Sequence, residues 1–206
     1  MESGFFFGWN AATVGFIGLL SCTVIEVWGL LLQAKTIWRN QSVQSLSVYM
    51  LGYQFIFLII GLVYGFAIAD IGVTINSFLL ALCMAIILWG VQLFRGFSVG
   101  EILYLAGLIV ILVGVTLLPQ KDISFFVCSI GSILTFFAQP YKIWRCKDAG
   151  VVEVKLLWVL FISTVFWTLY AYGTDNWVLK ITSPSFLVVL GLTIGIWIRY
   201  RNPKYR

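Results

Sequence analysis

The sequence contains no histidine, and only 10% of its 206 residues are charged. Without histidine, a histidine-based catalytic triad and a histidine-ligated metal centre are excluded, so any proton handling has to use a carboxylate. The scarcity of charge also excludes a water-soluble core. Soluble domains are about 25% charged and about 45–50% apolar, whereas this chain is 61% hydrophobic with a mean hydropathy of +1.01. The bilayer is the solvent that fits such a composition.

Sequence signatures of zinc, redox and nucleotide-binding sites are missing as well. The four cysteines have neither zinc-ligand nor redox spacing, and the glycines form no nucleotide-binding loop. The net charge of +5 does not predict nucleic-acid binding, because the basic residues fall between the apolar runs. No metal or cofactor is expected. Because paired carboxylates are absent too, an enzyme is the least favoured class.

Seven apolar stretches have about the 20 residues that a helix needs to cross the hydrocarbon core. The first has no basic residue before it and no small-residue cleavage site after it, so it is predicted to be a retained span rather than a signal peptide. The sequence therefore predicts an all-α membrane protein with seven transmembrane helices, over residues 11–33, 46–68, 73–94, 98–118, 123–141, 154–173 and 184–200.

The positions of lysine and arginine predict the orientation of these spans. If the N-terminus lies outside, the cytoplasmic loops and tail hold 11 of the 13 basic residues, and only Lys121 and Lys180 remain outside. Basic residues concentrate on the cytoplasmic side of membrane proteins. We therefore expect an external N-terminus and a cytoplasmic C-terminus, while the identity of the membrane stays open.

A repeat organises the chain. The string Gln-x-x-x-Ile-Trp-Arg occurs at 33–39 and again at 139–145, an offset of 106 residues. Such self-similarity indicates repeated structural units. Residues 1–95 are predicted to form a first three-helix repeat, 96–120 a linker transmembrane helix, and 121–206 a second repeat with a basic cytoplasmic tail. A single linker span keeps the repeats parallel, so we expect two parallel triple-helix bundles in a 3+1+3 order. The same offset pairs six further identities: Cys22 with Cys128, Val48 with Val154, Leu51 with Leu157, Phe55 with Phe161, Ile56 with Ile162 and Tyr64 with Tyr170.

Three-span repeats joined by one linker helix resemble the PQ-loop and SWEET (MtN3-like) transporter superfamily. The loop signature of that family is Pro-Gln near the end of the first span of each repeat, followed by basic residues and a serine-rich entry to the next span. Gln33 and Gln139 keep the glutamine, whereas Leu32 and Ala138 stand at the proline positions and Pro140 follows the second glutamine. The resemblance implies alternating access through a central pocket between the two repeats.

Two short strings resemble those that line the SWEET sugar pocket. The string Trp167-Thr-Leu-Tyr170 is similar to W-x-x-Y-G, whose tryptophan lines the pocket, and Thr-Ile-Asn ending at Asn76 is similar to T-I-N, whose asparagine contacts substrate. The second repeat has Pro-Ser ending at Ser185 where the family has Pro-Asn, and Gly61 stands where the family has a further tryptophan. The resemblance implies substrate contacts from Asn76, Trp167, Tyr170 and Ser185.

Several of these residues also have simpler interpretations. Asn76 could make an interhelical hydrogen bond. Trp167 could stack on a sugar ring or a cation, although most tryptophans of a membrane protein are interfacial anchors. Glu26 lies midway along the first span, where a charge costs about 2.5–3.5 kcal/mol. It could carry a proton, contact the substrate directly, for example through an amine, or hydrogen-bond to a neighbouring helix. We expect Gln33, Gln139 and Pro140 to form hinges, unless the glutamines merely end their apolar runs.

The sequence therefore predicts a transporter of a small polar solute, sugar or amino-acid-like, with membrane lipids as its other partners. Two alternatives use the same fold. A receptor of the KDEL-receptor kind is disfavoured because no lysine or arginine lies mid-span. A lipid- or glycolipid-handling protein is the other, because the tail GIWIRYRNP is similar to a domain attached to some lipid A disaccharide synthases. Homo-oligomerisation and proton coupling stay open.

Overall fold

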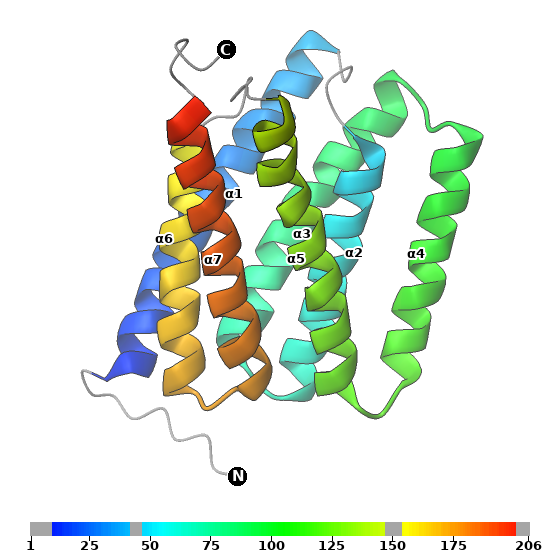
Figure 1. The fold of residues 1–206 in the computed structure, drawn as a ribbon. Helices are drawn as coiled ribbons and strands as arrows, with labels where there is room; N and C mark the ends of the chain where they lie inside the picture. The colour runs from blue at the N-terminus through cyan, green and yellow to red at the C-terminus, as the bar shows by residue number, and fades with distance from the viewer. Residues whose placement is uncertain (1–9, 42–46, 147–153, 201–206) are drawn as a thin grey trace. The chain divides into compact units, whose positions relative to one another are not determined.

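The computed structural model describes residues 10–41, 47–146 and 154–200, and within these ranges it contains helices and turns but no strand. Seven α-helices follow one another along the described chain (Figure 1). They are α1 (Ala11–Asn40), α2 (Val48–Ala67), α3 (Ile71–Phe94), α4 (Val99–Leu117), α5 (Lys121–Cys146), α6 (Val154–Gly173) and α7 (Trp177–Tyr200).

Three of these helices extend at least five residues beyond the apolar runs from which they were predicted. α1 ends at Asn40 instead of residue 33, α5 covers Lys121–Cys146 instead of 123–141, and α7 begins at Trp177 instead of residue 184. Backbone hydrogen bonding continues through polar residues until a cap ends it. At the start of α7 the side chain of Asn176 caps the helix, since its Oδ1 accepts a hydrogen bond from the backbone N–H of Leu179 at 3.1 Å.

Five helices, α1, α2, α3, α4 and α7, are long and apolar enough to cross a membrane. α6 contributes a shorter apolar helix, Leu157–Gly173. α5 is not one of these five helices. On this measure five of the seven predicted spans are accounted for, and the other two stay predictions.

The chain divides into two compact units. The continuous unit is Thr23–Thr135, and the discontinuous unit combines Met1–Cys22 with Phe136–Arg206. Both divisions fall inside helices. The first part of α1 therefore belongs to the discontinuous unit and its second part to the continuous unit. For α5 the first part belongs to the continuous unit and the last part to the discontinuous unit.

The 106-residue offset in the sequence also relates the helix bounds. α2 and α6 begin and end at equivalent residues, as do α3 and α7, and α1 and α5 end at equivalent residues. The turns that join the paired helices also agree. Ala69 and its equivalent Asp175 have φ of 54° and 59°, and Asp70 and its equivalent Asn176 each accept a hydrogen bond from the backbone N–H three residues later. The two halves thus share local structure as well as sequence.

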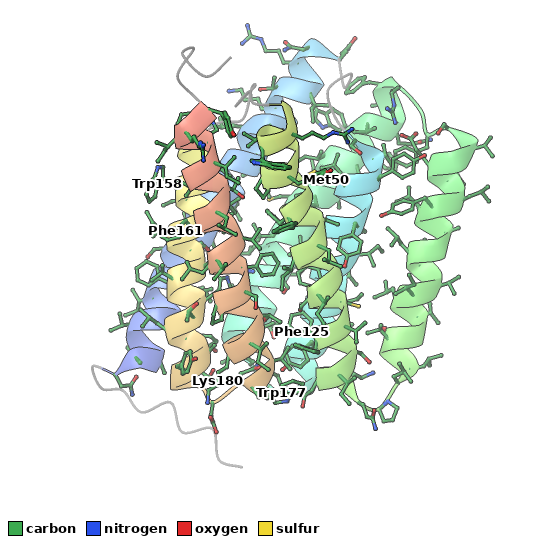
Figure 2. All side chains as sticks on the ribbon, viewed as in Figure 1. Met50, Phe125, Trp158, Phe161, Trp177 and Lys180 are labelled. Atoms are coloured by element: carbon green, nitrogen blue, oxygen red, sulfur yellow. The ribbon has the colours of Figure 1, made fainter. Side chains whose placement is uncertain are left out.

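Equivalent positions also build the hydrophobic core of each unit. In the continuous unit the buried cluster joins α1, α2 and α3: Ala34, Ile37, Val48, Leu51, Met84, Ile87 and Val91. In the discontinuous unit Leu157, Leu190 and Ile194 form the cluster, with Phe136, Leu160 and Phe161 packed against it. Phe161 also meets Trp158 edge to face, with ring centroids 5.7 Å apart (Figure 2). At the 106-residue offset, Leu157 and Leu190 correspond to Leu51 and Met84.

α4 packs on α2 and presents much of its remaining apolar surface outward. The Tyr104 hydroxyl donates to the carbonyl of Tyr49 at 3.1 Å, and their rings lie 5.1 Å apart. Leu103 and Val110, by contrast, are 68% and 71% exposed. The 19 residues of α4 span about 28 Å, which is close to the roughly 30 Å of a hydrocarbon core. Such a surface fits contact with lipid tails.

Candidate functional site

Asn76 lies in the first turns of α3, in the continuous unit, and is only 8% exposed. Its Oδ1 accepts a hydrogen bond from the hydroxyl of Thr23 on α1 at 2.8 Å, and Thr23 is 1% exposed. The alternative of an interhelical hydrogen bond is therefore present in the structure. Because an amide has both an acceptor and two donors, this bond leaves the Asn76 N–H groups available for a ligand.

Glu26 follows Thr23 on α1 at a spacing of three residues, so both side chains lie on neighbouring positions of one helix face. Glu26 is half-buried, whereas Thr23 is buried. The structure thus places a carboxyl one turn away from the Thr23–Asn76 pair. Proton carriage and substrate contact by Glu26 stay predictions.

Trp167 and Tyr170 lie one turn apart on α6, in the discontinuous unit. Their rings meet edge to face, with centroids 6.1 Å apart, and Tyr170 also contacts Phe16 of α1 at 6.1 Å. Tyr170 is 3% exposed, whereas Trp167 is half-buried. Trp167 therefore retains accessible surface while packing against Tyr170, and substrate contact by either residue stays a prediction.

The backbones of α1 and α6 meet beside this aromatic pair. A Cβ built on Gly15 would lie 2.4 Å from the backbone nitrogen of Tyr170, and one on Gly173 would lie 2.3 Å from the backbone nitrogen of Ala12. Only glycine permits helices to approach so closely. The position of Tyr170, and through it of Trp167, is consequently fixed by contact with the first part of α1.

Gly61 has no room for the tryptophan that the family resemblance led us to expect there. A Cβ at this position would lie 2.7 Å from Ser77 Oγ and 3.6 Å from Cε2 of Phe125. Close packing of α2 on α3 therefore requires a small residue at Gly61, and an indole at this place would displace α3.

Phe125 of α5 supplies an aromatic ring close to Gly61 instead. Its ring stacks on Tyr64 with centroids 4.3 Å apart and planes 12° apart, and on Phe57 at 5.7 Å and 9°. Sequence reasoning missed Phe125. The residue equivalent to it at the 106-residue offset is Leu19, so the repeat gave no signal for an aromatic side chain here.

Ser185 and Asn76 do not occupy equivalent places in their helices. The caps Asp70 and Asn176 align α3 with α7, and this alignment pairs Asn76 with Thr182. Thr182 is 4% exposed and its hydroxyl donates to the carbonyl of Val178 at 2.9 Å. Ser185 lies farther along α7 and donates to the carbonyl of Ile181. Thr182 is therefore a second-repeat candidate that the Pro-Ser string did not indicate.

The expected hinge residues lie inside continuous helices. α1 extends beyond Gln33 to Asn40, and α5 extends beyond Pro140 to Cys146. Pro140 is fully buried, while the side chain of Gln139 lies outside what the structure describes. Helix bending at these residues stays a prediction.

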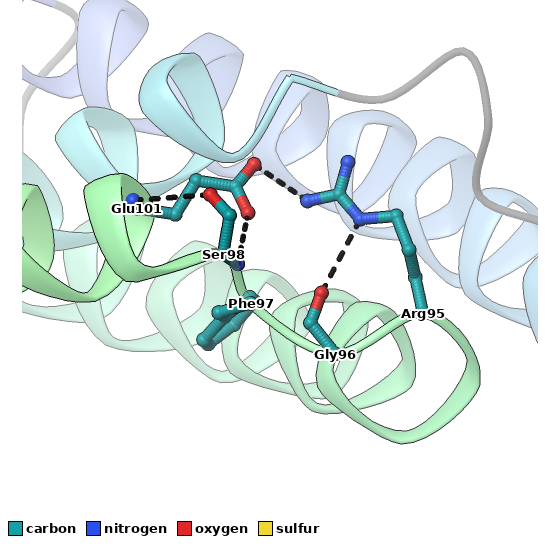
Figure 3. Close-up of a pocket in the computed structure, with 5 residues that line it drawn as sticks. All are labelled: Arg95, Gly96, Phe97, Ser98 and Glu101. Carbon is teal, nitrogen blue, oxygen red and sulfur yellow. Dashed lines mark hydrogen bonds and ion pairs between the residues drawn. The ribbon is translucent and has the colours of Figure 1, made fainter.

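A cavity of about 400 Å³ lies at the turn between α3 and α4 and involves none of these residues. Arg95 pairs there with Glu101 at 2.6 Å, and Glu101 and Ser98 cap α4 reciprocally (Figure 3). Gly96 and Phe97 complete the lining. Because Glu101 is only 7% exposed and its carboxylate is already paired, this arrangement serves to fix the turn.

Among the residues that the structure describes, no group of three or more histidine, cysteine, aspartate or glutamate side chains is placed to hold a metal ion. The polar candidates within the helices are therefore hydroxyls, the Asn76 amide and the Glu26 carboxyl. Such groups are able to hydrogen-bond to polar ligands.

No protein-family model matches the chain, and no curated protein matches its sequence. In three dimensions, however, it matches the 3.7 Å structure of a eukaryotic SWEET transporter with a TM-score of 0.72, over 93% of this chain and 95% of that one. The chain has a SWEET-like fold. At 13% sequence identity, the SWEET-like similarity extends to the fold and not to individual site residues. Together with five long apolar helices, the SWEET-like fold makes the chain an integral membrane protein.

Proposed function

We propose that this protein is a membrane transporter of a small polar solute, with a sugar as the first candidate, and that it works by alternating access. The SWEET-like fold over nearly the whole chain carries this proposal. Two features, one in each unit, support it: the N–H groups of Asn76, and the accessible surface of Trp167. Amides hydrogen-bond to hydroxyl-rich ligands, and tryptophan offers an apolar face to a sugar ring.

The transporter is proposed to have the 3+1+3 organisation. Residues 1–95 and 121–206 form the repeats and 96–120 the linker, with the N-terminus outside and the C-terminus in the cytoplasm. The equivalent bounds of α2 and α6, and of α3 and α7, support the repeats. The uneven distribution of lysine and arginine supports the orientation.

Uptake by purified protein in liposomes tests the function. The panel contains radiolabelled glucose, other neutral sugars and zwitterionic amino acids, and protein-free liposomes give the background. We expect uptake of at least one neutral sugar above this background.

A pair of tryptophans on α6 provides a matched comparison. Trp167→Ala is expected to lower uptake about fivefold to tenfold, because an aromatic contact contributes about 1–1.5 kcal/mol. Trp158→Ala removes a tryptophan that is 46% exposed and should leave uptake within about twofold. Equal losses in the two variants would remove Trp167 from the site. Binding without uptake would instead favour a receptor, and uptake of none of the solutes would contradict the transport proposal.

A further inference from the structure

The hydrogen bond between Thr23 and Asn76 determines which atoms of the amide a ligand can meet. Thr23 donates to Oδ1, so the carbonyl side of the amide is directed at α1. Within the described part of the chain, the structure gives the Nδ2 of Asn76 no hydrogen-bond partner. No fully buried side-chain nitrogen or oxygen in that part lacks a partner either, so Nδ2 must retain some accessible surface.

The second repeat does not reproduce this arrangement. At the 106-residue offset, Thr23 corresponds to Ser129 and Asn76 to Thr182. The Ser129 hydroxyl donates to the carbonyl of Phe125 at 2.8 Å, and that of Thr182 to the carbonyl of Val178 at 2.9 Å. Both hydroxyls thus satisfy their own helix, and an oriented amide occurs at this position in the first repeat alone.

We propose that Thr23 is a positioning residue that holds Asn76 as a hydrogen-bond donor, so that the site recognises an acceptor oxygen of a neutral, hydroxyl-rich solute rather than an ammonium group. This inference rests on the proposed transport function. An ammonium group has no acceptor, and it would leave the almost buried Nδ2 unpaired. A sugar hydroxyl oxygen satisfies the same N–H without bringing a charge into the site.

Sugar analogues separate donor from acceptor recognition. A deoxy-sugar lacks both functions at one carbon, whereas a deoxyfluoro-sugar keeps a weak acceptor and has no donor. The experiment measures inhibition of radiolabelled glucose uptake in proteoliposomes by deoxy- and deoxyfluoro-glucose, each substituted at C2, C3, C4 or C6, and by glucosamine.

For the wild type, we expect one carbon at which the deoxy analogue inhibits about tenfold less well than glucose, since an unpaired buried donor is strongly disfavoured. The fluoro analogue at the same carbon should stay within about threefold of glucose, because it still accepts the N–H. In Thr23→Val the amide of Asn76 is no longer held in one orientation. The concentrations at which the deoxy and fluoro analogues inhibit glucose uptake should then come within about twofold of each other. Thr23→Ser keeps the hydroxyl and should retain the wild-type ratio.

Each contrary result has a distinct meaning. If fluoro and deoxy analogues are equally poor inhibitors of the wild type, the substrate hydroxyl acts as donor and the amide faces the opposite way. If Thr23→Val keeps the wild-type ratio, Thr23 does not position Asn76. Absence of uptake of glucose and of every other neutral sugar in the panel by the wild type contradicts the sugar-transport proposal itself.

A second variant covers the case in which Thr23→Val does not fold. Asn76→Asp keeps an acceptor for Thr23 but removes both N–H donors, so its glucose uptake should fall to the level of Asn76→Ala. Retained uptake in Asn76→Asp would overturn the assignment of Asn76 as a donor.

Discussion

Replacing Gly15 by alanine should separate α1 from α6 and destabilise the protein. The new Cβ would lie 2.4 Å from the backbone nitrogen and 2.7 Å from the Cα of Tyr170. Backbone atoms inside a helix cannot rotate away as a side chain would, so one helix has to shift. Overpacking of this kind typically costs about 1–3 kcal/mol.

Gly29 provides the matched control in the same helix, because nothing lies within 4 Å of a Cβ at that position. Alanine at either site also gains about 1 kcal/mol of helix propensity. This gain is common to both variants, so the difference between them isolates the contact with Tyr170. For a chain of this size, about 1–3 kcal/mol corresponds to a difference in Tm of roughly 2–12 °C.

Thermal unfolding of the detergent-solubilised protein, followed by intrinsic tryptophan fluorescence, measures this difference. We expect Gly15→Ala to unfold at the lower temperature and Gly29→Ala to unfold at or above the wild-type temperature. Uptake by Gly15→Ala should fall as well, because Tyr170 supports the ring of Trp167. Equal Tm values for the two variants would refute the close approach of α1 and α6.

Two further predictions concern coupling and orientation. Glu26→Gln, which mimics the protonated acid, should lose pH-dependent accumulation of substrate while retaining substrate exchange. Wild-type uptake that does not depend on pH between about pH 5 and 8 would exclude proton carriage by Glu26. In a cysteine-free version of the protein, a membrane-impermeant maleimide should label Asp175→Cys in intact cells and Arg39→Cys only after permeabilisation; labelling of Arg39→Cys in intact cells would contradict the external N-terminus.

Much of the helix content follows from the sequence because it depends on local hydropathy. The apolar runs place the helices, and the polar start of α7 accounts for the main error. Lys180, Thr182 and Ser183 lower the local hydropathy, so the run seemed to begin at residue 184, although the Asn176 cap begins the helix earlier. A local cap contributes little to hydropathy over a span and is easily overlooked.

The contacts of the site were harder to predict from the sequence, because they depend on which helix packs against which. Asn76 was recognised from a three-residue string, but Thr23 resembled any other small residue in an apolar run. Its role becomes visible only when α1 and α3 are placed together. The same holds for Phe125, which fills space that the absent side chain of Gly61 leaves beside Tyr64.

The division of α1 between two units has a consequence for biosynthesis. The continuous unit, Thr23–Thr135, is complete once the chain has been inserted as far as α5. Residues 11–22, in contrast, have to wait in the bilayer for Phe136–Arg206 before Gly15 can meet Tyr170. Contacts between such distant parts of a chain form slowly and are vulnerable during synthesis. Changes near Gly15 and Tyr170 should therefore reduce the yield of assembled protein more than changes of equal thermodynamic effect in the continuous unit.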